Sequence, residues 1–391
     1  MLYLIPQGEA VARGYAGLWE AVVPWVGRHL FGVEAHTHLS GSGDKMFDWV
    51  QVFCFLALAL AATVVWTLLD RRRTHYERLY EWLRVYVRFG LAVVMIEYGG
   101  LKVVPSQFPR PSLYRLAQPF GDASPMGMLW TFMGASAPYT SFAGLTEWLG
   151  GVLLVFRRTA PLGALVSMAA MANVVMLNFC YDVPVKLFSS HLLAMAVFLA
   201  APHLRRLAGL LVLNRPVSPA PEPRLIRGRR LRRGVLVFQV LFAAGYSIYM
   251  MYTARKDLAE YYADRSPLQG IWKVEALQAD GREGPPPGAE ALQWSRVVFG
   301  DSNVVAIRLA SGSRRYGVEL DPAHGTLALT KRGDPAWKAL LAYQRPAPDR
   351  LTLAGTFEGR AVRASLHRID ESELPLLGRG FHWVSEYPFN R

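Results

Sequence analysis

The chain has 391 residues, of which 52% are hydrophobic and 12% aromatic, and its formal net charge is +13. Its arginines cluster beside apolar segments, where they set membrane orientation and meet anionic headgroups, so nucleic acid is not expected as a partner. Its two cysteines, Cys54 and Cys180, have neither a CxxC nor a metal-ligand spacing, so we expect no metal site and no thiol-disulfide chemistry.

Residues 1–48 form an N-terminal segment that we expect outside the cytoplasm or in the membrane interface. Tyr15–Gly32 is apolar but interrupted by polar residues, which is typical of an interfacial amphipathic helix. Either this segment crosses the membrane without an earlier helix, or Met1–Pro6 is the stub of one. Asp44 ends a glycine-rich turn and is the predicted N-cap of the first span.

Long apolar runs predict an all-α membrane bundle of about six spans. The expected spans are Trp49–Leu69, Val85–Val104, Tyr139–Phe156, Ala160–Asn178, Val185–Ala201 and Gly234–Tyr252. Residues 49–203 would form the main transmembrane bundle. Residues 204–233 are rich in proline and arginine and would form a cytoplasmic linker, and residues 234–253 would form the last transmembrane helix.

Residues 254–391 differ in character, because short apolar runs alternate with turn residues. The candidate strands are Gly270–Ala276, Gln293–Phe299, Val304–Leu309, Arg314–Glu319, Leu327–Lys331, Leu340–Tyr343, Arg350–Ala354 and Arg360–His367. This pattern predicts an all-β antiparallel domain, an up-and-down meander curled into a small barrel or half-barrel. Its interior would be wide enough for one small apolar ligand or would be filled by side chains, and we favour the filled interior. We expect Trp272 to be buried at one closed end, with Arg363 or Arg368 over its ring.

The positive-inside rule gives one self-consistent orientation. Arginine-rich loops follow the first, third and fifth spans, at residues 71–84, 157–158 and 214–233. These loops would be cytoplasmic, so the N-terminus and the β domain would be extracytoplasmic.

Ionisable and amide side chains interrupt or flank the expected spans. The candidates for a polar membrane site are Glu97, Lys102, Glu147, Asn173, Asn178, Asp182, Lys186 and His191. An ionisable group at the bilayer centre costs about 2.5–3.5 kcal/mol on insertion scales, so it is usually functional or paired. The predicted orientation places these groups in the outer half of the bundle, where they could relay protons, bind an anionic or quinone-like headgroup, or coordinate an ion. We expect Glu97, Glu147 and His191 to face the bundle interior, because lipid exposure of each would cost several kcal/mol. The alternative is that they are polar contacts between helices, with Glu97 paired to Lys102 or Arg88.

Residues 85–203 resemble the DoxX family of four-helix membrane proteins. The residues that carry this resemblance are Arg88-Phe89-Gly90, Gly99-Gly100-Leu101-Lys102, Glu147-Trp148-Leu149-Gly150-Gly151 and the run from Tyr181 to His191. The resemblance implies a bacterial cytoplasmic (inner) membrane protein associated with redox chemistry and with a quinone as cofactor. It supplies no catalytic residues. Gly270-Ile271-Trp272 is similar to the opening strand of lipocalin-like barrels.

Two functions follow as hypotheses. The first is a redox- or quinone-associated membrane module that works with a membrane redox partner. The second is a non-catalytic envelope scaffold, or a protein whose β domain binds a lipid, a small lipophilic ligand or a protein partner. No metal, nucleotide or nucleophile-base motif supports a self-contained enzyme, so catalysis stays an open question.

Overall fold

The computed structural model describes residues 8–73, 75–218, 228–263, 266–285, 288–300, 303–331 and 333–389. The chain forms two compact units. We call Met1–Val103 with Phe142–Met251 the bundle unit, and Val104–Ser141 with Tyr252–Arg391 the barrel unit. The proposed stub Met1–Pro6 and residues 219–227 of the predicted linker lie outside the described residues.

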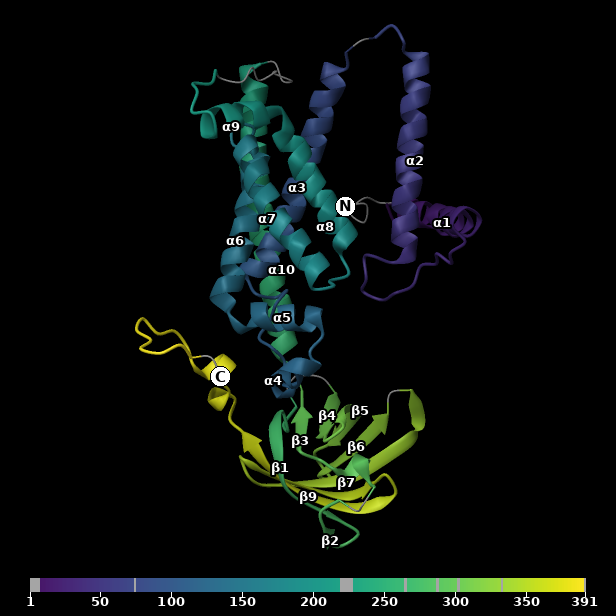
Figure 1. The fold of residues 1–391 in the computed structure, drawn as a ribbon, viewed down its shortest axis with the longest axis vertical. Coiled ribbons are helices and arrows are strands. Elements are labelled where there is room, and N and C mark those ends of the chain that lie inside the picture. The colour runs from purple at the N-terminus through teal and green to yellow at the C-terminus, as the bar shows by residue number, and fades with distance from the viewer. Residues whose placement is uncertain are drawn as a thin grey trace. The chain divides into compact units, whose positions relative to one another are not determined.

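The bundle unit is helical (Figure 1). Its helices are α1 (Gly8–Val26), α2 (Met46–Leu69), α3 (Glu77–Val103), α6 (Ala137–Val155), α7 (Ala160–Cys180), α8 (Lys186–Ala200), the 3-10 turn η4 (Ala201–His203), α9 (Leu204–Leu211) and most of α10 (Arg229–Ala263). Among the described residues, four stretches are long and apolar enough to cross a membrane, namely α2, α7, α10 and the run Lys186–Leu211 from α8 through α9. The predicted count of six is not confirmed, because α3 and α6 are not among them.

Glycines let α3, α6 and α7 approach one another closely. A Cβ at Gly99 would lie 2.5 Å from the backbone nitrogen of Trp148, and a Cβ at Gly151 would lie 2.8 Å from that of Ile96. A Cβ at Gly150 would lie 2.6 Å from Oγ of Ser167 on α7. Gly99 and Gly151 thus let α3 and α6 meet backbone to backbone, and Gly150 lets α6 approach Ser167 of α7.

Asp44 holds the segment before α2 to the bundle. Its two carboxylate oxygens accept hydrogen bonds from the backbone nitrogens of Lys186 (2.8 Å) and Leu187 (2.9 Å). The prediction that Asp44 caps the first span is therefore wrong, because it caps α8, and Lys45 occupies the N-cap position of α2. The free N–H groups at the start of any helix can donate to such a carboxylate, whether it is local or distant in sequence.

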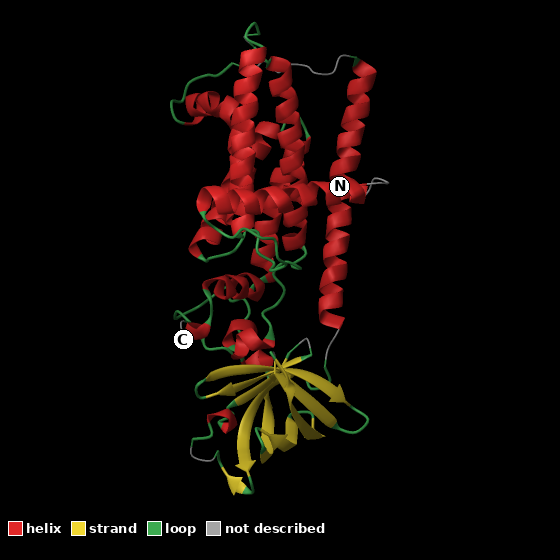
Figure 2. Cartoon of the chain, turned by 90° about the vertical axis from the view of Figure 1, so that its right-hand side faces the viewer, coloured by secondary structure: helices red, strands yellow, loops and turns green. Residues whose placement is uncertain are grey.

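The barrel unit contains an antiparallel β-barrel, visible in Figures 1 and 2. Its strands are β1 (Gly270–Ala279), β3 (Arg296–Phe299), β4 (Val304–Leu309), β5 (Gly312–Asp321), β6 (Thr326–Lys331), β7 (Asp334–Ala347), β8 (Arg350–Phe357) and β9 (Arg360–Ile369), with the short β2 (Arg282–Glu283) attached to β1. Consecutive barrel strands pair, and β1 pairs with β9 to close the ring. All eight predicted strands and their meander order are confirmed.

Apolar side chains fill the barrel, as the alternating pattern predicts. Trp272 is fully buried, and its Nε1 donates to the carbonyl oxygen of Leu268 at 2.9 Å. The predicted cation over its ring is wrong, because Arg345 of β7 lies there, 5.9 Å from the ring centroid. Arg363 is exposed, and Arg368 has its Nε 3.0 Å from where a Cβ of Gly270 would stand.

The connection between α3 and α6 folds with the barrel. It contains α4 (Leu113–Ala117), η3 (Phe120–Asp122) and α5 (Pro125–Ala135). Leu113 and Ala117 pack on a cluster of Ile271, Val298 and Ala306 on the barrel surface. The Tyr114 hydroxyl donates to the Val304 carbonyl and accepts from the Gly300 nitrogen at 3.2 Å.

Replacing Trp272 with alanine is expected to destabilise the barrel by about 3–5 kcal/mol, because it empties the buried end of the core. Hydrogen exchange on the full chain should show faster exchange of the β1, β3 and β9 amides while the α7 and α8 amides stay protected. Trp383→Ala is the control, since the Trp383 side chain is 92% exposed. Unchanged barrel exchange in Trp272→Ala would contradict this view of the core.

Candidate functional site

The central feature of the bundle unit is a buried ion pair between α3 and α6. Lys102 Nζ lies 2.8 Å and 2.6 Å from the two carboxylate oxygens of Glu147. The side chains are 8% and 6% exposed. Gly144 makes room for the lysine, because a Cβ there would stand 2.6 Å from Cβ of Lys102. The ring centroid of Tyr98 is 5.8 Å from the ammonium.

In this geometry the two charged groups are each other's partners, and we call such a pair closed. Both carboxylate oxygens face one ammonium, so each charge is compensated where water is excluded. Removing two charges from water is costly, and only such close contact offsets the cost. The arrangement stabilises the α3–α6 contact and leaves the carboxylate engaged by the lysine on both oxygens.

Glu97 has a different partner. Its carboxylate accepts a hydrogen bond from the Tyr246 hydroxyl of α10 at 3.2 Å, in a half-buried position. The alternative in which Glu97 pairs with Lys102 or Arg88 is therefore wrong, because Lys102 reaches α6 and Glu97 reaches α10. Ser247, the next residue of α10, accepts a hydrogen bond at its Oγ from Trp148 Nε1 at 2.9 Å, which adds a polar contact between α6 and α10.

The other candidates gather at the connection between α7 and α8. Lys186 Nζ lies 2.8 Å from the exposed Asp182 carboxylate and 3.9 Å from that of Asp44. Asn178 is buried, and its Nδ2 donates to Ser189 Oγ at 3.0 Å. These contacts join the ends of two neighbouring helices.

Asn173 and His191 lie apart from these groups. Asn173 is exposed on α7, and His191 is exposed on α8 with Nδ1 2.7 Å from the Leu187 carbonyl of its own helix. The prediction that His191 faces the bundle interior is wrong. Residue 191 lies about 130° around the helix from the middle of the buried face, which contains Ser189, Leu192 and Ala196.

The eight candidates therefore form separate groups: the pair Lys102–Glu147, the pair Glu97–Tyr246, the connection with Asn178, Asp182 and Lys186, and two exposed side chains. Sequence reasoning missed Tyr246, Ser247 and Ser189. Hydroxyl side chains inside apolar spans are the signal that could have indicated them, since such groups seek partners across helices. Among the described residues, no group of three or more His, Cys, Asp or Glu could hold a metal ion.

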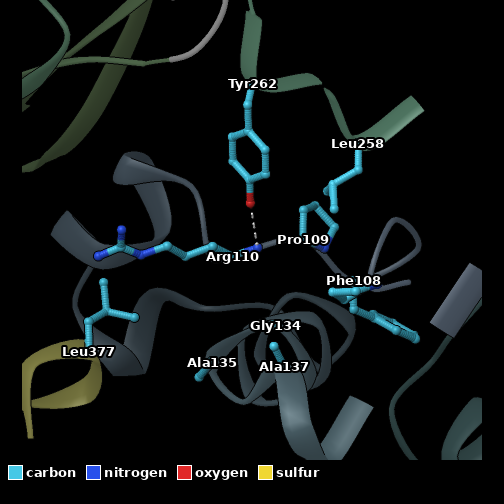
Figure 3. A pocket seen from close by; sticks show the side chains of 10 residues that line it. Phe108, Pro109, Arg110, Gly134, Ala135, Ala137, Leu258, Tyr262 and Leu377 are labelled. Carbon is cyan, nitrogen blue, oxygen red and sulfur yellow. Dashed lines mark hydrogen bonds between the residues drawn. The ribbon is translucent and has the colours of Figure 1, made fainter. Parts of the chain in front are cut away.

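The barrel unit carries a cleft of about 290 Å³ (Figure 3). It is lined by Pro105, Phe108, Pro109, Arg110, Gly134, Ala135, Ala137, Leu258, Tyr262 and Leu377. The Tyr262 hydroxyl accepts from the Arg110 backbone nitrogen at 3.1 Å, and the Arg110 guanidinium pairs with Glu371 at 3.2 Å. The walls are mostly apolar, so the cleft suits an apolar group better than an ion.

Comparison with known proteins finds one uncharacterised relative. The chain is 35% identical over 125 residues to the uncharacterized protein YwoB of Bacillus subtilis (strain 168), a match that covers 32% of this chain and 78% of YwoB. No family model and no solved structure matches the chain. Because YwoB is uncharacterised, the similarity indicates no activity and no ligand for this chain.

Lys102→Met is expected to lower the free energy of unfolding by about 3–5 kcal/mol, because it leaves the Glu147 carboxylate buried without its partner. The double variant Lys102→Met with Glu147→Leu should recover most of the loss. Lys256→Ala is the matched control, since Lys256 and Glu260 form an exposed pair worth at most about 0.5 kcal/mol. Thermal unfolding of the purified full chain measures all four proteins. If Lys102→Met were as stable as the parent, the pair would not be important for the stability of the bundle unit.

Proposed function

We propose that this chain, which belongs to the same family as the uncharacterized protein YwoB, is a non-catalytic membrane scaffold that presents its β-barrel at the outer face of the bacterial cytoplasmic membrane. The observation that carries this proposal is the closed Lys102–Glu147 pair. A reaction site needs a charged or polar group that the substrate can reach, whereas both groups of this pair are buried and bonded to each other.

The barrel unit supports a presenting role. Its core is filled with side chains, so a ligand held inside the barrel has no support. The α3–α6 connection packs on the barrel through Tyr114, and α10 runs on to the chain's first strand. The chain passes between the bundle unit and the barrel unit three times, at residues 103–104, 141–142 and 251–252. The cleft beside Phe108 and Tyr262 is the proposed place for a lipophilic ligand or an apolar side chain of a partner.

A redox- or quinone-associated module is the second candidate, as the DoxX resemblance implies. The observation that favours it is the half-buried Glu97–Tyr246 pair between α3 and α10. The phenol O–H could donate a hydrogen bond to the carbonyl oxygen of a quinone, and the neighbouring carboxyl group, when protonated, could supply a proton as the membrane redox partner reduces that quinone. Under either proposal α3 and α6 also span the membrane and make six spans in all.

The two candidates make opposite predictions for quinone. In the native host, the scaffold proposal expects Glu97→Gln and Tyr246→Phe to restore the phenotype of a deletion strain as fully as the parent chain does. It also expects purified protein to contain quinone well below one molecule per chain. Tyr114→Ala, which loosens the barrel unit, should restore the phenotype poorly. If the purified parent contained one quinone per chain, and purified Tyr246→Phe contained none, the scaffold proposal would be contradicted and the redox module favoured.

Topology can be tested separately with reporter fusions. Fusions at residues 78 and 220 should report the cytoplasm, and a fusion after residue 300 should report the outside, by the positive-inside rule. A fusion at residue 120 must report the same side as residue 300, because α4 and η3 fold with the barrel. Opposite sides for residues 120 and 300 would contradict the barrel unit itself, and a cytoplasmic barrel would contradict only the orientation.

A further inference from the structure

The last described residues of the barrel unit form a loop that carries aromatic side chains. After the short helix α11 (Pro375–Gly378), Arg379 contacts two residues further along the chain. Its Nη2 donates to Ser385 Oγ at 3.4 Å, and its guanidinium lies 4.2 Å from the ring centroid of Phe389. These contacts bring the end of the segment back to its start, as the yellow trace in Figure 1 shows. We call residues 379–389 the tail loop.

The tail loop exposes its apolar side chains and does not cover the barrel with them. Each of its four most exposed apolar side chains is at least 72% exposed: Phe381, Trp383, Val384 and Tyr387. The rings of Phe381 and Trp383 meet edge to face, with centroids 5.0 Å apart. A cluster of exposed aromatic side chains in a soluble part of a chain marks a surface that meets a membrane or a partner.

The start of the tail loop is held close to a membrane helix. Leu377 of α11 lines the same cleft as Leu258 of α10. α10 is long and apolar enough to cross a membrane, and its uncharged run ends at Tyr252. Leu258 comes six residues later, about 9 Å along the helix at 1.5 Å per residue. The headgroup layer on each side of a bilayer is about 5–8 Å deep, so the tail loop begins near the edge of that layer.

The tail loop is long enough to reach the headgroups from there. Trp383 follows Leu377 by six residues, which span up to about 20 Å when extended. Lipid is therefore within reach of every chain that is inserted in the membrane, whereas a protein partner would have to be recruited. Weak affinity suffices, because α10 keeps the loop beside the bilayer at a high effective concentration.

We infer that the tail loop is an interfacial anchor that inserts Phe381, Trp383 and Tyr387 into the lipid headgroup layer of the membrane that α10 crosses. Tryptophan and tyrosine concentrate at this level because their rings have an apolar body and a polar edge. The anchor would limit the tilting of the barrel unit on its membrane helices. The inference requires α10 to cross the membrane, and it is independent of any redox activity and of the side on which the barrel lies.

The test measures the depth of the tail loop in the full chain, in nanodiscs of phosphatidylcholine and phosphatidylglycerol. Cys54→Ala and Cys180→Ala remove the two native thiols, and His382→Cys carries a nitroxide spin label between the aromatic side chains. Electron paramagnetic resonance compares collisions of the label with oxygen, which concentrates in lipid, and with a water-soluble nickel chelate. Arg282→Cys gives the control label, because Arg282 is exposed and pairs with the end of β1 that is remote from α10.

The label at residue 382 is expected to collide with nickel several-fold less often, and with oxygen more often, than the label at residue 282. Replacing Phe381, Trp383 and Tyr387 together with serine should raise the nickel collisions at residue 382 to those at residue 282. Hydrogen exchange of the barrel amides should not change in this triple variant, because the three side chains are exposed.

Three results would overturn the anchor. The first is a label at residue 382 that meets nickel as often as the label at residue 282, which would show that the loop lies in water. The second is a label that meets neither reagent, which would show that protein covers the loop, from a second copy or from the same chain. The third is low nickel access that persists in the triple serine variant, which would show that the aromatic side chains do not hold the loop in lipid.

Discussion

The buried contact between Lys102 and Glu147 is the constraint on which the rest of the bundle unit depends. A lysine and a glutamate inside apolar helices are tolerated only when they meet, and they meet here at 2.6 Å. The meeting requires α3 and α6 to touch, which Gly99, Gly144 and Gly151 permit. Once α3 and α6 are in register, Trp148 and Glu97 are positioned to bond Ser247 and Tyr246, and α10 is fastened to both helices.

The same two helices determine where the barrel unit begins. Residues 104–141 connect α3 to α6, and they fold with the barrel rather than forming a free loop. Tyr114 reaches the barrel because residue 300 is glycine; a Cβ there would stand 2.3 Å from the tyrosine ring. Asp122 adds an ion pair with Arg308 at 3.4 Å. Residues 104–141 therefore follow Lys102 of the buried ion pair closely in sequence and contain Tyr114, which contacts the barrel.

The strands were predictable because their signal is local. Alternating apolar residues and turn residues such as those at Gly281 and Gly359, both with positive φ, define each hairpin without knowledge of distant chain. The polar site was predictable only as a set of residue types. Which acid meets Lys102, and whether His191 faces inward, depends on the neighbours each helix finds, and sequence spacing does not encode that choice. Asp44 shows the same limit, because its position suggested a local cap and its actual partner is the start of α8, 142 residues away. The α3–α6 connection is rich in proline and glycine, which is typical of a loop, and no local pattern indicates the contacts that Leu113 and Tyr114 make.

The most direct test of the central contact is solid-state NMR of the full chain in lipid bilayers, with ¹⁵N-labelled lysine and ¹³C-labelled glutamate. A strong dipolar coupling between a lysine Nζ and a glutamate side-chain carboxyl carbon is expected, and Lys102→Met should remove it. The coupling should persist when quinone is added, because the pair is closed. Absence of a coupling that depends on Lys102, or its loss on adding quinone, would contradict the role assigned to Lys102 and Glu147.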